Sequence, residues 1–136
     1  MSTVRIAVVG AGNWGRNHVR TLASMADVEL AAVCDTDDER RAELSRQYPG
    51  LRVTDSLDVA FDGADGVVVA TPVLSHVPVA REALQRGLPA LIEKPMARSV
   101  DEAKELVDLV DETGVPVVSG HLLVFHPAIE YLQKII

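Results

Sequence analysis

Residues 4–15 read Val4-Arg5-Ile6-Ala7-Val8-Val9-Gly10-Ala11-Gly12-Asn13-Trp14-Gly15. The first half is a mostly apolar run typical of a buried strand, and the second half is a G-x-G-x-x-G turn that leads into a helical pattern. In such a turn the first glycine permits a sharp bend, the second lets the backbone approach a pyrophosphate, and the third lets strand and helix pack closely. The amides of residues 12–15 would then face the phosphates at the positive end of the helix. The stretch predicts a dinucleotide site formed by residues 10–15; the alternative is a glycine-rich turn that binds no ligand.

Downstream of this stretch, short apolar runs alternate with segments of helical period, and Gly, Pro, Asp or Ser marks each change. The predicted strands are 4–9, 28–34, 51–53, 66–70, 90–93 and 115–119. The predicted helices are 14–25, 37–47, 56–61, 75–86, 100–113 and 128–136. Because most of the strands are apolar throughout, they are typical of a parallel sheet covered on both faces. The pattern therefore predicts a doubly wound, mainly parallel six-stranded α/β sheet.

Length and composition limit the class of protein. The 136 residues suit one compact domain, and 48% hydrophobic residues can form a core, which excludes intrinsic disorder. Thirteen Lys and Arg against 20 Asp and Glu give a net charge of −7, which argues against nucleic acid or an anionic membrane as partner. The single cysteine, Cys34, excludes a disulfide framework and a thiolate zinc site, is expected to be a small core residue, and favours a cytoplasmic location.

Asp35 follows the second predicted strand, 20 residues after Gly15, where a dinucleotide site places an acid for the adenosine ribose hydroxyls. The alternative is that Asp35 only caps the next helix. The neighbouring acids Asp37 and Asp38 would repel a 2′-phosphate, so NAD is favoured over NADP. Two arginines at 40 and 41 keep NADP as a second possibility.

Two further strands end in residues that could contact a ligand, because the carboxyl ends of strands in an open α/β sheet face the ligand crevice. The fourth is followed by Thr71, Pro72 and His76, with Ser75 as an expected helix cap. The fifth ends in Glu93 and Lys94 ahead of a proline. Lys94 could bind a ribose hydroxyl, orient a substrate hydroxyl or transfer a proton; the alternative for this acid and base is a surface ion pair.

Three histidines have no clear signal of their own. His18 on the first helix is expected to be a surface or packing residue. His121 ends the sixth strand and could approach a nicotinamide, whereas His126 is expected to precede the last helix as a boundary residue. They lack carboxylate or cysteine neighbours at ligand spacing, so no metal site is predicted.

With these motifs in this order, the whole chain resembles the glucose-fructose oxidoreductase / inositol dehydrogenase (Gfo/Idh/MocA) family of NAD(P)-dependent oxidoreductases. The resemblance implies a Rossmann fold with strand order 3-2-1-4-5-6 and substrates that are sugars, cyclitols or nucleotide-linked sugars. It also implies that Lys94 lies beside the nicotinamide ribose and the reacting carbon as the catalytic residue, while Thr71, Pro72, His76 and Glu93 line the cofactor groove. Val124 stands where similar members often have arginine.

In this family a second α/β domain provides the substrate pocket, and residues 1–136 correspond to the dinucleotide-binding domain alone. The last predicted helix reaches the end of the sequence with an apolar face and without a stop signal, so we expect the chain to be a fragment. That face is expected to cause self-association into a homo-oligomer. The alternative function is a stand-alone NAD-binding module or subunit without catalysis of its own.

Overall fold

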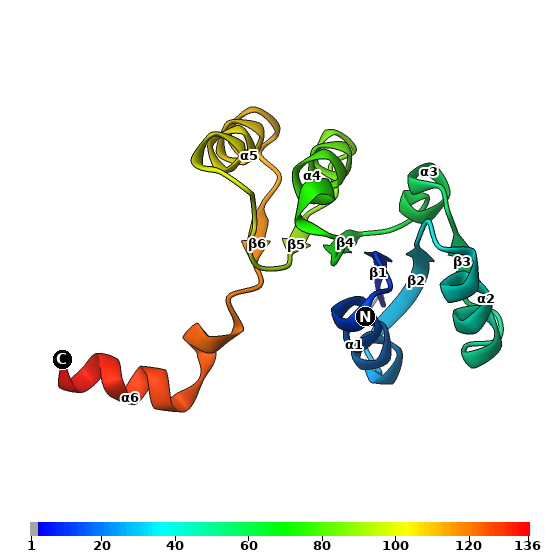
Figure 1. Ribbon diagram of the computed structural model, residues 1–136, viewed down its shortest axis with the longest axis horizontal. Coiled ribbons are helices and arrows are strands. Elements are labelled where there is room, and N and C mark those ends of the chain that lie inside the picture. The colour runs from blue at the N-terminus through cyan, green and yellow to red at the C-terminus, as the bar shows by residue number, and fades with distance from the viewer. Residues whose placement is uncertain (1–2) are drawn as a thin grey trace.

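The structure, a computed structural model, describes residues 3–136, and within them six parallel strands form one sheet in the order β3-β2-β1-β4-β5-β6 (Figure 1). The strands are β1 (Val4–Val9), β2 (Val28–Cys34), β3 (Arg52–Thr54), β4 (Gly66–Val69), β5 (Ala90–Ile92) and β6 (Val117–Ser119). The helices are α1 (Asn13–Ser24), α2 (Asp38–Gln47), α3 (Leu57–Phe61), α4 (His76–Gln85), α5 (Val100–Thr113) and α6 (Pro127–Ile135). This confirms the predicted doubly wound α/β sheet and its strand order.

Two layers of apolar side chains hold helices to the two faces of the sheet. Because side chains alternate along a strand, Val8 of β1 packs with α1 and α2, whereas its neighbour Val9 packs with α3, α4 and α5. Figure 1 shows these two sets of helices on opposite sides of the sheet. The central strands are therefore buried on both faces, which explains their continuous apolar sequence.

Two of the strands and the longest helix have the predicted bounds, and most other ends move by one or two residues. The cap of α5 differs in detail from an ideal capping box. Ser99 Oγ accepts the backbone N–H of Glu102 at 3.2 Å, but the Glu102 carboxylate accepts the N–H of Arg98, one residue before the cap. Gly114 ends the helix in the left-handed conformation, with φ of +68°.

The start of α4 differs from the prediction. A 3-10 turn, η1 (Val73–Ser75), precedes the helix, and the side chain of Ser75 makes no cap hydrogen bond although it occupies the cap position. The sequence-based expectation of a serine cap is therefore wrong. Ser75 has helical rather than extended backbone angles, and Pro78, three residues later, has no N–H to donate to a capping hydroxyl.

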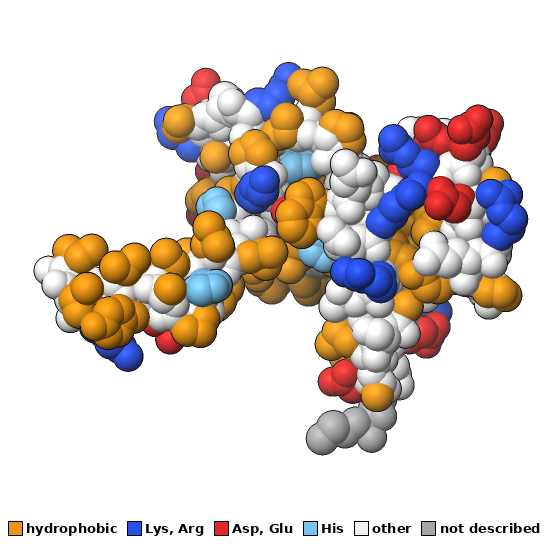
Figure 2. Space-filling model, turned by 60° about the horizontal axis from the view of Figure 1, so that its bottom comes forward, with side chains coloured by type: hydrophobic (Ala, Val, Ile, Leu, Met, Phe, Trp, Pro, Cys, Tyr) orange, Lys and Arg blue, Asp and Glu red, His pale blue; other side chains and the backbone are white. Residues whose placement is uncertain are grey.

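The C-terminal segment leaves the sheet as an arm (Figure 1). β6 continues into an unpredicted 3-10 turn, η2 (Leu122–Phe125), and then into α6, whose cap is the His126 ring, which accepts the N–H of Ala128 at 3.1 Å. Figure 2 shows hydrophobic side chains along this arm. The large exposed ones are Leu122, Leu123, Val124, Phe125, Tyr131, Leu132, Ile135 and Ile136. Across residues 3–136, every helix is too short or too polar to cross a bilayer.

Candidate functional site

The ends of β1, β2, β4 and β5 surround a cavity of about 590 Å³, within the about 300–1,000 Å³ range usual for ligand pockets. Interstrand hydrogen bonds continue to the edge of the sheet: the N–H of Gly10 donates to the Cys34 carbonyl at 2.7 Å, and that of Glu93 to the Val69 carbonyl at 2.9 Å. The candidate residues that line the cavity are Gly10, Gly12, Asn13, Trp14, Asp35, Thr71, Pro72, His76, Glu93 and Lys94. The sheet thus brings most of the predicted residues to one place.

The three glycines of the turn have different surroundings. Gly10 has φ of +92°, and a Cβ there would lie 2.7 Å from the carbonyl of Ala70, just after the neighbouring strand β4. A Cβ on Gly15 would overlap the carbonyl oxygen of Gly10, so the first turn of α1 lies directly against the bend. A Cβ on Gly12 would meet no atom within 4 Å. Gly10 and Gly15 are therefore required by packing, while Gly12 borders open space beside the cavity.

The N-terminus of α1 has no side-chain cap. Gly12 occupies the cap position, and the first turn of the helix contains no acidic residue. By contrast, Asp37 caps α2 and Ser99 caps α5. The first amides of a helix need an acceptor and carry the positive end of its dipole. An anion lying against Gly12 would supply that acceptor, so the turn fits the diphosphate of a dinucleotide.

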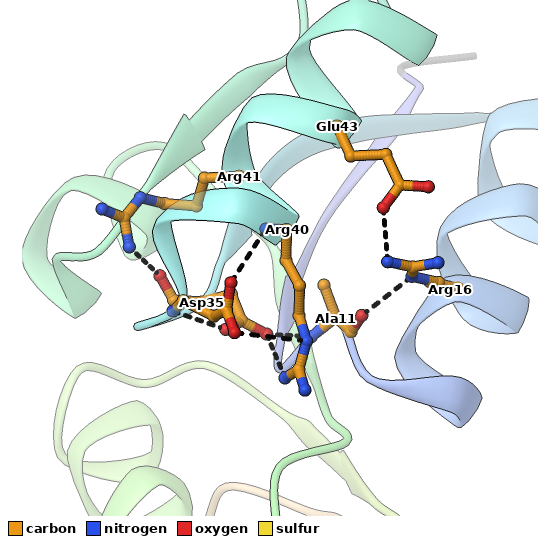
Figure 3. A network of polar contacts seen from close by, with 7 residues as sticks. Ala11, Arg16, Asp35, Arg40, Arg41 and Glu43 are labelled. Carbon is orange, nitrogen blue, oxygen red and sulfur yellow. Dashed lines mark hydrogen bonds and ion pairs between the residues drawn. The ribbon is translucent and has the colours of Figure 1, made fainter.

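Asp35 is 7% exposed and joins the end of β2 to the glycine turn (Figure 3). Its Oδ2 accepts the N–H of Ala11 at 2.6 Å, and its Oδ1 accepts the N–H of Asp37 at 2.9 Å. The cap of α2 is Asp37, whose carboxylate accepts the N–H of Arg40 at 3.0 Å. The reading of Asp35 as a simple helix cap is therefore wrong, and its carboxylate lies in the cavity wall.

Of the two arginines that follow Asp35, Arg40 lines the cavity and Arg41 does not (Figure 3). Arg40 lines the cavity, with Nη1 3.6 Å from Oδ2 of Asp35. Arg41 donates to the Asp35 carbonyl oxygen at 2.7 Å and pairs with Asp38. Arg41 is absent from the cavity wall, so Arg40 is the arginine that could meet a phosphate on the ribose.

His76 is 2% exposed, and both of its ring nitrogens are engaged by backbone carbonyl oxygens. Nδ1 lies 2.9 Å from the oxygen of Pro95, and Nε2 lies 2.8 Å from the oxygen of Thr71. The ring therefore connects the segment after β4 with the segment after β5. The hydroxyl of Thr71 is buried and has no hydrogen-bond partner among residues 3–136.

Glu93 is paired with His18, not with its neighbour Lys94. The His18 Nε2 lies 2.7 Å from Oε1 of Glu93, which is 6% exposed, and the N–H of Lys94 donates to Oε2 at 3.2 Å. His18, expected to be a surface or packing residue, is half-buried and in addition makes this polar contact. Its position three residues after Gly15 and next to buried Val19 puts it on the inner face of α1, a signal the sequence contained. The side chain of Lys94 is exposed on the cavity wall and has no ion pair within the described chain.

Three predicted residues do not line the cavity. Ala11 is fully buried with its N–H bonded to Asp35, Gly15 packs against Gly10, and His121 is exposed. Lining residues without a sequence signal include Asp55 and Leu57 at the start of α3 and Val73 in η1. In the part of the chain that the structure describes, no three His, Cys, Asp or Glu side chains are grouped as metal ligands.

Cys34 also borders the cavity, at the end of β2. Burial, followed by the nearby carboxylates of Asp35 and Asp55, raises the pKa of its thiol from 9.0 to about 11, and Arg41 opposes this shift. The thiol is therefore protonated and poorly nucleophilic at neutral pH, as expected for a core residue.

Comparisons with known proteins agree with this arrangement. The model of the GFO_IDH_MocA family, an oxidoreductase family with an NAD-binding Rossmann fold, matches residues 4–121. UDP-N-acetylglucosamine 3-dehydrogenase of Acidithiobacillus ferrooxidans is 35% identical over 134 residues, which cover 98% of this chain and 42% of that protein. Inositol 2-dehydrogenase of Mycolicibacterium smegmatis is 36% identical over 140 residues, covering 100% of this chain and 41% of that protein. The chain thus spans about two fifths of the length of these relatives.

The solved structure of GenD2 from gentamicin A biosynthesis, in complex with NAD, matches with a TM-score of 0.89 at 33% identity, covering 99% of this chain and 39% of that one. The chain therefore belongs to the Gfo/Idh/MocA oxidoreductase family and has its NAD-binding Rossmann fold.

Proposed function

We propose that the cavity at the carboxyl edge of the sheet holds NAD along one path, from Asp35 at the adenosine end to Lys94 at the nicotinamide end. The observation that carries this proposal is the uncapped N-terminus of α1, with open space at Gly12, between those two residues. The chain would act as the cofactor-binding domain of an oxidoreductase.

At the adenosine end, the Asp35 carboxylate accepts hydrogen bonds from the ribose hydroxyls. It is already held by the N–H of Ala11, so it needs little reorganisation on binding. The same charge repels a 2′-phosphate, which favours NAD over NADP. Arg40, 3.6 Å from Asp35, supports some residual binding of NADP.

At the diphosphate, the amides of Gly12, Asn13 and Trp14 donate to the phosphate oxygens. Trp14 is half exposed and lines the cavity, so its ring shields the diphosphate from solvent. Ala11 and Gly15 act indirectly, because they set the shape of the turn.

At the nicotinamide end, bound NAD would accept a hydride from a hydroxyl-bearing carbon. The Lys94 side chain binds the substrate hydroxyl and orients it or takes its proton. Thr71 and Pro72 contribute to the wall of the same cavity. His121, exposed after β6, would approach the nicotinamide only once the substrate is enclosed.

The substrate class follows from relatives named for their action on UDP-N-acetylglucosamine and inositol. We propose a sugar, cyclitol or nucleotide-linked sugar, enclosed by a second unit in addition to residues 1–136. The exposed apolar side chains of η2 and α6 support this, because a face of this kind is normally covered. In the isolated chain, a second copy would cover it and form a homo-oligomer. The single buried thiol supports a cytoplasmic location.

Calorimetric titration with NAD tests the binding step. We expect saturable heat with one site per chain, and NADP is expected to bind more weakly. Absence of heat at millimolar NAD would contradict the proposal.

A further inference from the structure

The segment that carries Lys94 is held on both sides by histidines from other elements. On the amino side, His18 of α1 lies 2.7 Å from the carboxylate of Glu93. On the carboxyl side, His76 of α4 lies 2.9 Å from the carbonyl oxygen of Pro95. Lys94 lies between these two anchored residues.

The Glu93 side of this arrangement is closely packed. Its carboxylate is contacted from two directions: Oε1 lies 2.7 Å from Nε2 of His18, and Oε2 accepts the backbone N–H of Lys94 at 3.2 Å. On a third side, a Cβ on Gly120 would lie only 3.1 Å from Oε2 of Glu93. A carboxylate that is 6% exposed depends on such partners, because a buried charge that loses one is costly.

The His76 side connects two strand ends. Both partners are carbonyl oxygens, so both contacts are hydrogen bonds when each ring nitrogen carries hydrogen, and the neutral ring keeps one of them. The Nδ1 contact holds Pro95, next to Lys94, whereas the Nε2 contact holds Thr71 in the segment after β4. The charged groups lining this cavity are Asp35, Arg40, Asp55, Glu93 and Lys94.

We propose that His18 and His76 are positioning residues which fix residues 93–95 from two sides and thereby place the Lys94 side chain at the nicotinamide end of the bound cofactor. Neither histidine needs to touch the cofactor, since their ring nitrogens that make these contacts are occupied by protein atoms. We call the two histidine contacts to residues 93–95 the histidine clamp. Its effect on NAD rests on the proposed function, whereas the clamp itself is a property of the free protein.

Two pairs of substitutions separate positioning from folding. Asn places a side-chain N–H where His Nδ1 lies, and Gln places one where Nε2 lies. His76→Asn therefore keeps the bond to Pro95, whereas His76→Gln keeps only the bond to Thr71. For His18, Gln keeps the Nε2 contact with Glu93 and Leu removes it. Arg20→Gln, an exposed change on the same helix as His18, is the control.

The first measurement compares dissociation constants for NAD and for ADP-ribose, which lacks the nicotinamide. We expect His76→Gln and His18→Leu to weaken NAD about fivefold, corresponding to one hydrogen bond, and to leave ADP-ribose unchanged. His76→Asn, His18→Gln and Arg20→Gln should bind both ligands as the original chain does. Equal effects of the Asn and Gln variants at 76, or equal weakening of both ligands, would overturn the clamp.

The second measurement uses the free protein, so it tests the clamp independently of ligand binding. If the unsubstituted chain binds neither ligand, the proposed function is refuted, and this measurement still decides whether the clamp exists. Nitrogen NMR should find hydrogen on Nδ1 of His76, and the backbone order parameters of residues 93–95 should fall in His76→Gln but not in His76→Asn. An unprotonated Nδ1, or unchanged order in both variants, would overturn the inference. If one variant at 76 does not fold, the His18 pair gives the same comparison.

Discussion

Oδ2 of Asp35 accepts the backbone N–H of Ala11 at 2.6 Å, and this bond ties the end of β2 to the glycine turn after β1. The acid that we propose to bind a ribose is thus also bonded to the turn that we propose to hold the phosphates. Removing the Asp35 side chain would disturb both the proposed ribose contact and the glycine turn. Removing only its negative charge would leave an oxygen that can accept the N–H of Ala11.

Asp35→Asn is predicted to separate the two cofactors. The amide oxygen can still accept the Ala11 N–H, but the carboxylate charge is lost. Because hydrogen bonds to charged groups contribute about 1.5–3 kcal/mol, NAD should bind about 10- to 100-fold more weakly, while NADP should bind as before or more tightly. The measurement is calorimetric titration with both cofactors. Equal weakening of NAD and NADP would refute the role of Asp35; Asp35→Ala is the control that should also lower the melting temperature.

Alanine is predicted to have different effects at two glycines three residues apart, lowering stability at Gly15 and NAD affinity at Gly12. A Cβ on Gly15 overlaps the Gly10 carbonyl oxygen, so Gly15→Ala should lower the free energy of unfolding by about 1–3 kcal/mol or more. A Cβ on Gly12 meets no protein atom within 4 Å, so Gly12→Ala should change stability by less than about 1 kcal/mol. It should nevertheless weaken NAD at least about tenfold, because the methyl group occupies the approach of the diphosphate. Denaturant unfolding and NAD titration check the pair, and unchanged NAD affinity in Gly12→Ala would contradict the phosphate site.

Cys34 is predicted to resist thiol reagents in the folded protein. With its pKa raised to about 11, roughly one thiol in a thousand is ionised at pH 8, and the side chain is buried as well. Labelling should be slow in buffer and complete in denaturant. Because the unfolded thiol, with a pKa of 9.0, ionises first, this group should also lower the free energy of unfolding as pH rises from about 9 to 11. Immediate stoichiometric labelling of the native chain would show that this end of β2 is open.

The apolar face of α6 is predicted to cause self-association. Leu132 and Ile135 are exposed and lie three residues apart, on one side of the helix. Changing both to Glu should shift sedimentation of the chain toward the monomer without altering the melting temperature. A strictly monomeric original chain at high concentration would exclude this face as an interface between copies.

Much of the fold could be predicted because the local signals agree with the tertiary structure. β1 and β2 are mostly apolar and end in three buried residues each, and α5 has a cap, an apolar stripe and a terminal glycine. The predicted glycine turn, Asp35 and Lys94 meet at one edge because parallel strands end there together.

What could not be predicted depends on contacts between distant residues. Ser75 has a residue type typical of a cap, but the preceding 3-10 turn leaves it with helical rather than extended backbone angles. His18 and Glu93 are 75 positions apart, and no local pattern pairs them. The bond between Asp35 and Ala11 likewise requires β1 and β2 to be aligned first.

The proposed path of NAD runs along the cavity from Asp35 to Lys94, across the N-terminus of α1. Backbone amide chemical shifts recorded during an NAD titration test it most directly. We expect saturable shifts at Gly12, Asn13, Asp35, Thr71 and Lys94, and none in α6. Absence of saturable shifts at millimolar NAD, or shifts confined to residues outside the cavity, would contradict it.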